Sequence, residues 1–306
     1  MSLEKVIKAA RAFLEPNQVQ TVIYHSPCAD GSGAAFSAWL ALGDKASYEP
    51  FCRQNEQPFD LTLLKGKNII LIDCAFKKKD LPQARSLANK LIILDHHRSA
   101  MQDLEGEPGC FFTMGNCGAI LAWHYFYGLE SSPPQLLRLI EDRDILQWQK
   151  KELSEPLAYG LSKINPNYNF RQYKEYTDES KLFDLIRLGK QIQLETQKLI
   201  VASASKAQMR LLHFNQTKQS YKVMCLEMPS YDLTVEVSEY LYKNITDLDF
   251  TMLWHPLDNN RFRISFRTDR PNIDLSIIAS RFGGGGHANK AGATVDHSPW
   301  ELLELD

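Results

Sequence analysis

The 306-residue sequence lacks several features that mark special classes of protein. Its six cysteines show no CxxC spacing, which argues against a zinc ribbon and a disulfide framework and favours free thiols in a reducing compartment. No apolar run approaches the length of a transmembrane helix, and the amphipathic segment 1–16 lacks the apolar core of a signal peptide. We therefore expect a cytoplasmic protein without a membrane partner.

The sequence also lacks an excess of basic residues. The 35 Lys and Arg residues face 37 Asp and Glu residues, which gives a formal net charge of -2. This balance argues against a protein that holds long duplex nucleic acid on a broad basic surface. A small anionic substrate is compatible with it, because a metal and a few placed arginines supply positive charge locally.

The most informative stretch that is present follows the apolar run 91–94. Four consecutive apolar residues predict a fully buried strand of a parallel sheet, and Asp95, His96 and His97 come directly after them. Open α/β sheets bind ligands at the carboxyl ends of their strands. Carboxylate oxygen and imidazole nitrogen together suit Mn, Fe, Co or Zn, although a solvated surface loop is the plain alternative for such a triplet.

Three further elements end in comparable residues. Segment 22–24 reads as a strand that leads to His25, Cys28 and Asp30, and segment 68–72 as a strand that leads to Asp73. An amphipathic helical stretch over 136–140 ends on a short acidic run that contains Asp142 and Asp144. Because the carboxyl ends of parallel strands share one edge of a sheet, these endings predict a single metal centre.

The pattern of elements predicts two α/β domains. Strands near 47–52, 68–72 and 91–94 alternate with helices, which is typical of a doubly wound parallel sheet. We expect this domain over 1–185, a helical connector over 186–212, with helical character from 182, and a smaller α/β domain over 213–306. Strands near 221–226, 250–254 and 261–266 and helices near 232–242 and 273–282 are expected in the second domain.

These motifs resemble those of the DHH phosphoesterases of the branch that carries a second, DHHA1, domain. The resemblance covers about residues 20–296 and rests on the triplet at 95–97, the loop from His25 to Asp30, the lone Asp73, and the run Gly283–Gly286 followed by His287. The fourth motif matches Asp142 best, with Asp144 a near competitor. Most of the family place an Asp where this chain has Cys28, which is either a ligand or a small buried side chain.

The resemblance implies two divalent metal ions, manganese first, with Fe, Co, Zn or Mg as other candidates. It implies that Asp73 bridges the metals. His25, Cys28 and Asp142 would complete one side, and Asp30 and His96 the other. Asp95 and His97 would serve catalysis, Asp95 by orienting or binding ligands and His97 by contacting a phosphoryl oxygen or a ligand. The substrate's phosphates would be held by Arg98, Arg267, Gly284, Gly285, Gly286 and His287.

The function that the resemblance implies is hydrolysis of short nucleotide phosphodiesters, such as 3′-5′ cleavage of oligonucleotides. Two alternatives remain open at this point: an exopolyphosphatase, and a non-catalytic nucleotide-binding regulator that has lost a metal through the change at Cys28. We also expect that an exposed antiparallel edge strand could support a homodimer.

Overall fold

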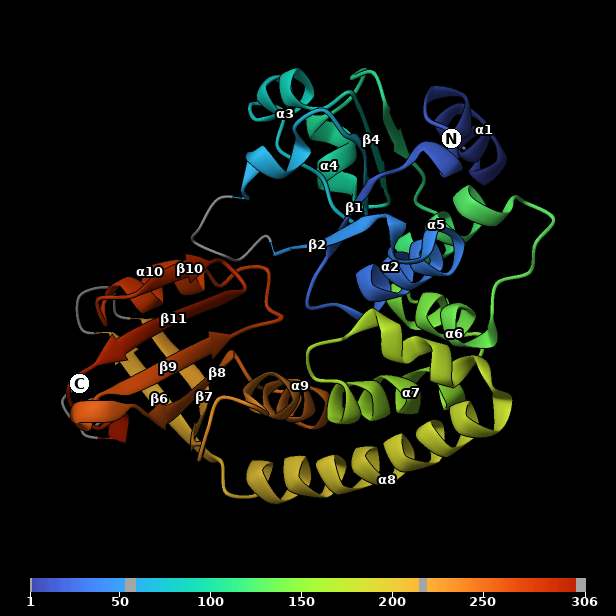
Figure 1. The fold of residues 1–306 in the computed structure, drawn as a ribbon. Helices are drawn as coiled ribbons and strands as arrows, with labels where there is room; N and C mark the ends of the chain where they lie inside the picture. Colours follow the sequence, from blue (N-terminus) through green and yellow to red (C-terminus); the bar gives the residue numbers. More distant parts are fainter. Residues whose placement is uncertain (1, 53–58, 215–218, 301–306) are drawn as a thin grey trace. The chain divides into compact units, whose positions relative to one another are not determined.

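The structure is a computed structural model that describes residues 2–52, 59–214 and 219–300. It separates into two units, Met1–Gln193 and Leu194–Asp306, which are described one at a time (Figure 1). Within the described ranges, we find no helix with the length and apolar character needed to cross a lipid bilayer.

The first unit contains a five-stranded parallel sheet. Its strands are β1 (Thr21–His25), β2 (Ser47–Phe51), β3 (Asn68–Ile72), β4 (Lys90–Asp95) and β5 (Cys110–Phe112). Its helices are α1 (Leu3–Phe13), α2 (Ala29–Leu42), α3 (Leu81–Leu87), α4 (Arg98–Asp103), α5 (Gly118–Tyr127), α6 (Gln135–Asp144) and α7 (Lys151–Ile164), and α8 (Glu179–Ala204) crosses the boundary between the units. Single-turn or irregular 3-10 segments lie at Pro16–Gln18, Gly43–Lys45, Leu61–Leu64 and Phe170–Thr177.

The strand order β2-β1-β3-β4-β5 fixes where the sheet can bind a ligand. After β1 the chain crosses to β2 on one side, and from β3 onward it proceeds to the other side. The loops that leave β1 and β3 therefore diverge, and the carboxyl ends of these two strands are the place where open α/β sheets bind ligands.

Burial on both faces holds the sheet in place. Ile70 and Ile72 pack with helices α1, α2 and α5, whereas Ile69 and Leu71 pack with α3 on the opposite face. Side chains alternate between the two faces of a strand, so a continuous apolar run fits only a strand covered on both sides. The expected doubly wound parallel sheet is confirmed.

The second unit contains a six-stranded mixed sheet in the order β10-β11-β9-β8-β7-β6. Its strands are β6 (Gln208–Phe214), β7 (Gln219–Glu227), β8 (Phe250–Pro256), β9 (Phe262–Arg267), β10 (Gly285–His287) and β11 (Lys290–Val295). Helices α9 (Thr234–Asn244) and α10 (Leu275–Ser280) and a 3-10 turn at Asp258–Asn260 complete it. The α/β character expected for this part of the chain is present.

One expectation for the connector is wrong. Helical character was expected from 182 to 212, but α8 ends at Ala204 and residues 208–214 form strand β6, paired antiparallel with β7. Met209, Leu211 and His213 alternate with Leu212, which is buried, so the period is that of a strand. Because the segment directly follows the long helix α8, the change from a helical to a strand period was not recognised in the sequence.

Helices α7 and α8 cross at unusually close range because glycines lie at the crossing. A Cβ atom added to Gly189 of α8 would lie 1.8 Å from the carbonyl oxygen of Pro156, and one added to Gly160 of α7 would lie 2.7 Å from that of Leu185. Both glycines are buried. Only residues without a side chain allow the two backbones to meet in this way.

This crossing yields a stability prediction. Gly189→Ala should lower the free energy of unfolding by about 1–3 kcal/mol, because overpacking outweighs the roughly 1 kcal/mol that alanine gains over glycine in a helix. Denaturant unfolding measures the change. Lys190→Ala, at the exposed neighbouring position, is the matched control and should be close to neutral. Equal stability of the two variants would contradict the close crossing.

Candidate metal centre

The carboxyl ends of three neighbouring strands carry the candidate ligands. His25 is the last residue of β1, Asp73 directly follows β3, and Asp95 ends β4, with His96 and His97 immediately after it. Since β1, β3 and β4 are adjacent in the sheet, these side chains meet at the carboxyl edge described above. The convergence expected from the strand endings is therefore present.

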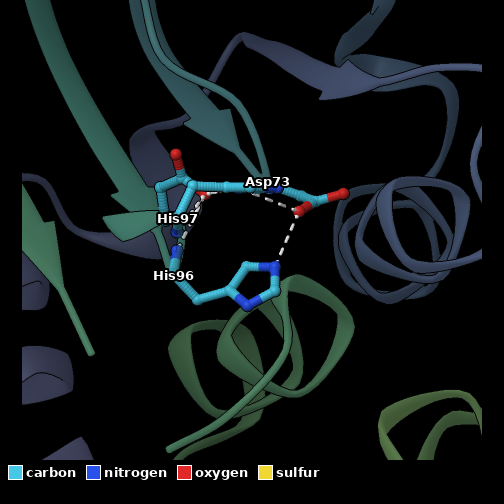
Figure 2. Close-up of side chains that lie close together, drawn as sticks. Asp73, His96 and His97 are labelled. Atoms are coloured by element: carbon cyan, nitrogen blue, oxygen red, sulfur yellow. Dashed lines mark hydrogen bonds and ion pairs between the residues drawn. The ribbon is translucent and has the colours of Figure 1, made fainter. Parts of the chain in front are cut away.

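Asp73 lies at the middle of this group. Its Oδ1 is 3.1 Å from His96 Nε2 and 3.8 Å from His97 Nδ1, and its Oδ2 is 3.4 Å from His25 Nδ1. Figure 2 shows the side chains of Asp73, His96 and His97 turned toward one another. Asp73 has a φ of 60°, in the left-handed region, which Asp tolerates better than most residues.

Asp30 is held by the N-terminus of a helix. It lies in the first turn of α2, and its two carboxylate oxygens accept the backbone N–H groups of Gly118 and Ala119 at 2.6 and 2.7 Å. These N–H groups belong to the first turn of α5, which favours a negative charge. A Cβ on Gly118 would lie 2.5 Å from Asp73 Cβ, so glycine lets α5 approach both carboxylates.

His96 joins the two halves of the group. Its Nε2 lies 3.4 Å from Asp30 Oδ2 and 3.6 Å from Asp144 Oδ2, in addition to its contact with Asp73. Asp144 is the last residue of α6, and it was expected only as the competitor of Asp142. The structure brings Asp144, and not Asp142, to the other ligands.

Asp142 has a structural role in α6 instead. Its carboxylate accepts the backbone N–H of Gln149 and the hydroxyl of Ser154, each at 2.6 Å, and the N–H of Lys150 at 3.3 Å. The geometry therefore favours Asp144 over Asp142 as the candidate ligand of the fourth motif. Residues two positions apart in a helix point about 200° apart, so only one of the two acids can face the strand ends.

Asp95 fixes the orientation of His97. The Asp95 side chain is fully buried, and its Oδ1 accepts His97 Nδ1–H at 2.7 Å and the backbone N–H of His96 at 2.8 Å. This contact leaves the other ring nitrogen of His97 free to act, and the His97 side chain is one-third exposed. Asp95 is thus a positioning residue for the imidazole beside it.

Cys28 lies beside His25 and Asp73. It immediately precedes α2, it is half-buried, and its sulfur belongs to a group with His25 and Asp73 whose ligand atoms all lie within 4.8 Å of one another. Cys74, by contrast, is buried and its thiol faces the carbonyl oxygen of Ile23. Of Cys28 and Cys74, only Cys28 has its sulfur close to other candidate metal ligands.

The electrostatics of the group favour a cation. The carboxylate of Asp73, 3.4 Å from the ring, raises the pKa of His25 to about 10. Burial alone would lower the pKa of His96, but the hydrogen bonds and charges of Asp30 and Asp73 outweigh it and raise this pKa to about 11. Burial and the charge of Asp30 raise the pKa of Asp144 to about 7. The carboxylates thus create a negative site that takes up protons or binds a metal.

The donor set fits divalent metal ions. Two sets of three, His25 with Cys28 and Asp73, and Asp30 with His96 and Asp144, each bring their ligand atoms within 4.8 Å of one another. In the part of the chain that the structure describes, Asp73 Oδ2 is buried and accepts no hydrogen bond. Because an unsatisfied buried carboxylate oxygen is costly, this atom is suited to a metal bond.

The second unit holds the other expected phosphate-binding residues. Arg267 in β9 pairs with Lys290 in β11, which in turn pairs with His287 in β10, so the three side chains form a row on one face of the sheet. In the adjacent row on that face, Ser265 pairs with Gly292 and Gly292 with Gly285. Arg98, in the first unit, begins α4 and is exposed.

Comparison with known proteins identifies relatives of modest identity. No protein-family model matches the chain. It is 29% identical over 291 residues to Uncharacterized protein R106 of Acanthamoeba polyphaga mimivirus, covering 90% of this chain and 67% of that protein. It is 23% identical over 303 residues to the oligoribonuclease NrnB of Bacillus subtilis, covering 90% of this chain and 72% of NrnB.

Two solved structures share the architecture. The pGpG-specific phosphodiesterase PggH of Vibrio cholerae superposes with a TM-score of 0.56 at 10% identity, over 94% of this chain and 96% of PggH. The exonuclease RecJ, solved bound to manganese, superposes with a TM-score of 0.54 at 15% identity, over 100% of this chain and 93% of RecJ. The chain therefore shares the fold of these two proteins, and the resemblance inferred from its motifs is confirmed at the level of the fold.

Proposed function

We propose that the chain is a metal-dependent phosphoesterase that hydrolyses short nucleotide phosphodiesters. The position of Asp73 carries this proposal. One buried carboxylate faces three imidazoles, and it belongs both to the group with His25 and Cys28 and to a group with His96. A carboxylate shared in this way is suited to bridge two metal ions.

Two sets of residues would hold the ions. His25, Cys28 and Asp73 form the first set, and Asp30, His96 and Asp144 form the second, with Asp73 shared between them. Imidazole and carboxylate ligands suit manganese, iron, cobalt or zinc, and the Cys28 thiolate would shift the preference toward softer metals. When bound, such a pair of ions supplies charge neutralisation at the phosphoryl oxygens and lowers the pKa of water.

The protein side chains would orient the substrate and move protons. His97, held by Asp95, presents its free ring nitrogen at the edge of the group, where it can hydrogen-bond a phosphoryl oxygen. The helix dipole at the start of α5 and the buried ion pairs hold Asp30 and Asp73 in place before any substrate arrives. This preorganisation is the protein's own contribution to catalysis.

In the second unit, a basic row would bind the anionic part of the substrate. Arg267, Lys290 and His287 stand beside a strip of the sheet that carries small side chains or none, at Ser265, Gly292 and Gly285. Cationic side chains next to accessible backbone suit a phosphate. Similarity to an oligoribonuclease and to a pGpG-specific phosphodiesterase supports a short nucleotide as the substrate class.

The function is tested by assaying the metal-stripped protein with and without added Mn²⁺. Single-turnover reactions would use a dinucleotide, a polyphosphate and a simple phosphomonoester. We expect Mn²⁺-dependent cleavage of the dinucleotide, and Asp73→Ala should reduce it by roughly 100-fold or more, since loss of even an outer-shell partner costs about 10- to 100-fold. Preference for polyphosphate, or a tenth of the activity left in Asp73→Ala with its metal retained, would refute the proposal.

Asp142 and Asp144 form a matched pair that tests the metal assignment. Asp144→Ala should weaken Mn²⁺ binding by roughly 10-fold or more and leave thermal stability nearly unchanged, because its side chain contacts other ligands. Asp142→Ala should instead lower stability by about 1–3 kcal/mol, because it leaves the buried Ser154 hydroxyl without its acceptor and removes the acceptor of the Gln149 and Lys150 N–H groups. Calorimetric metal titration and thermal unfolding separate the two effects, and the reverse pattern would restore Asp142 as the ligand.

The basic row of the second unit is tested through binding. Arg267→Ala and His287→Ala should each raise KM by roughly 10-fold, which corresponds to loss of a charge-assisted hydrogen bond of about 1.5–3 kcal/mol. Metal content should not change. Lys243→Ala, at an exposed position of helix α9, removes the same charge as Arg267→Ala and serves as its control. Loss of metal in parallel with loss of activity would place Arg267 or His287 in the metal site instead.

A further inference from the structure

A cavity beside the metal centre has no role in the chemistry described so far. It lies entirely within the first unit and has a volume of about 880 Å³. Pockets that bind small molecules have volumes of roughly 300–1,000 Å³. The cavity is therefore large enough for a ligand of nucleotide size.

Three chain connections place the cavity next to the candidate ligands. Phe51, at the end of β2, pairs with His25 in the register of the sheet, and its carbonyl oxygen accepts the backbone N–H of Ser26 at 3.1 Å. Ala75 follows Asp73 by two residues, and Ser99 follows His97 by two. Phe51, Ala75 and Ser99 all line the cavity. A group held here would therefore lie near the candidate metal ligands.

Aromatic rings form the floor of the cavity. Phe51, Phe59 and Phe76 contact one another in a triangle, with ring centroids 5.9, 5.7 and 5.6 Å apart. Phe76 is buried in the apolar cluster on this face of the sheet, and Phe51 and Phe59 are half-buried and pack against the same cluster. Such a surface favours a planar, weakly polar group, and it offers a chain of phosphates neither a positive charge nor a hydrogen-bond donor.

Polar groups line the rim. Lys77 and Lys79 are exposed there, and with the residues that the structure describes neither ammonium group forms an ion pair. Asp80 precedes α3, and among the described residues its side chain does not cap that helix, so its carboxylate could accept an N–H group from a ligand. Asp103, also at the rim, accepts the backbone N–H of Lys78. The rim thus offers donors for a phosphate and an acceptor for the edge of a base.

We propose that this cavity is a nucleobase-binding subsite, in which the base of the nucleotide next to the cleaved phosphate lies against Phe51, Phe59 and Phe76. The inference rests on the proposed function and narrows it. It assigns the substrate to base-bearing nucleotides and excludes polyphosphate, which has no group for the aromatic floor. Base–aromatic stacking tolerates any base sequence, because every base presents a π-face.

Binding of products tests the subsite without relying on catalysis. The full chain, loaded with Mn²⁺, would be titrated with the four ribonucleoside 5′-monophosphates and with ribose 5-phosphate, which lacks only the base. We expect the nucleotides to bind at least 10-fold more tightly. Phe59→Ala removes part of the floor, and Gln83→Trp fills the cavity from an exposed position on α3, so each should reduce this difference at least five-fold.

Phe13→Ala is the matched control, because it removes a partly exposed phenylalanine of α1 that does not line the cavity. This variant should show the same difference in affinity between nucleotides and ribose 5-phosphate as the wild-type protein. Equal affinity of nucleotides and ribose 5-phosphate for the wild-type protein would overturn the inference, as would a difference that survives in both Phe59→Ala and Gln83→Trp. If nucleotides bind more tightly than ribose 5-phosphate but no Mn²⁺-dependent hydrolysis is found, the proposed function is refuted and the base-binding subsite is still supported.

Discussion

The burial of two acidic side chains at one point determines the arrangement of the first unit. Asp30 and Asp73 are each only 1% exposed, and like charges out of water are costly unless other groups offset them. The two buried charges are offset by the imidazoles of His25 and His96 and by the N-terminus of α5. The lack of a side chain at Gly118 lets α5 approach them. The sheet supplies the rigid frame on which these groups meet, and divalent cations would complete the charge balance.

Much of this arrangement could be predicted from the sequence, because it depends on local patterns. The apolar runs at 69–72 and 91–94 are long enough to identify strands buried on both faces, and the residues behind them are therefore at one edge of a sheet. Sequence patterns did not reveal the short strands β5, β10 and β11. Each has only three to six residues, and β10 and β11 consist largely of glycine and alanine, so their pairing depends on neighbours that only the fold brings near.

The choice between Asp142 and Asp144 could not be made from the sequence pattern. Both acids lie at the end of α6, and nothing in their spacing tells which one faces the strands. The answer depends on the rotation of the helix, which is set by burial of Leu136, Leu139 and Ile140 and by the need of the following turn for an acceptor. Similarly, the aromatic cavity is assembled from segments after β2, β3 and β4, and no single segment predicts it.

The left-handed backbone at Asp73 has a consequence for how such a protein can diverge. Few residues adopt this conformation readily, and Asn and Gly are the ones that share it with Asp. Either replacement would keep the turn after β3 while removing the central charge. A descendant could thus lose the proposed hydrolysis through a single substitution and retain its fold and its nucleotide-sized cavity. Loss of the central charge and loss of folding are separable at this position, so a protein that only binds lies one substitution away from one with the proposed activity.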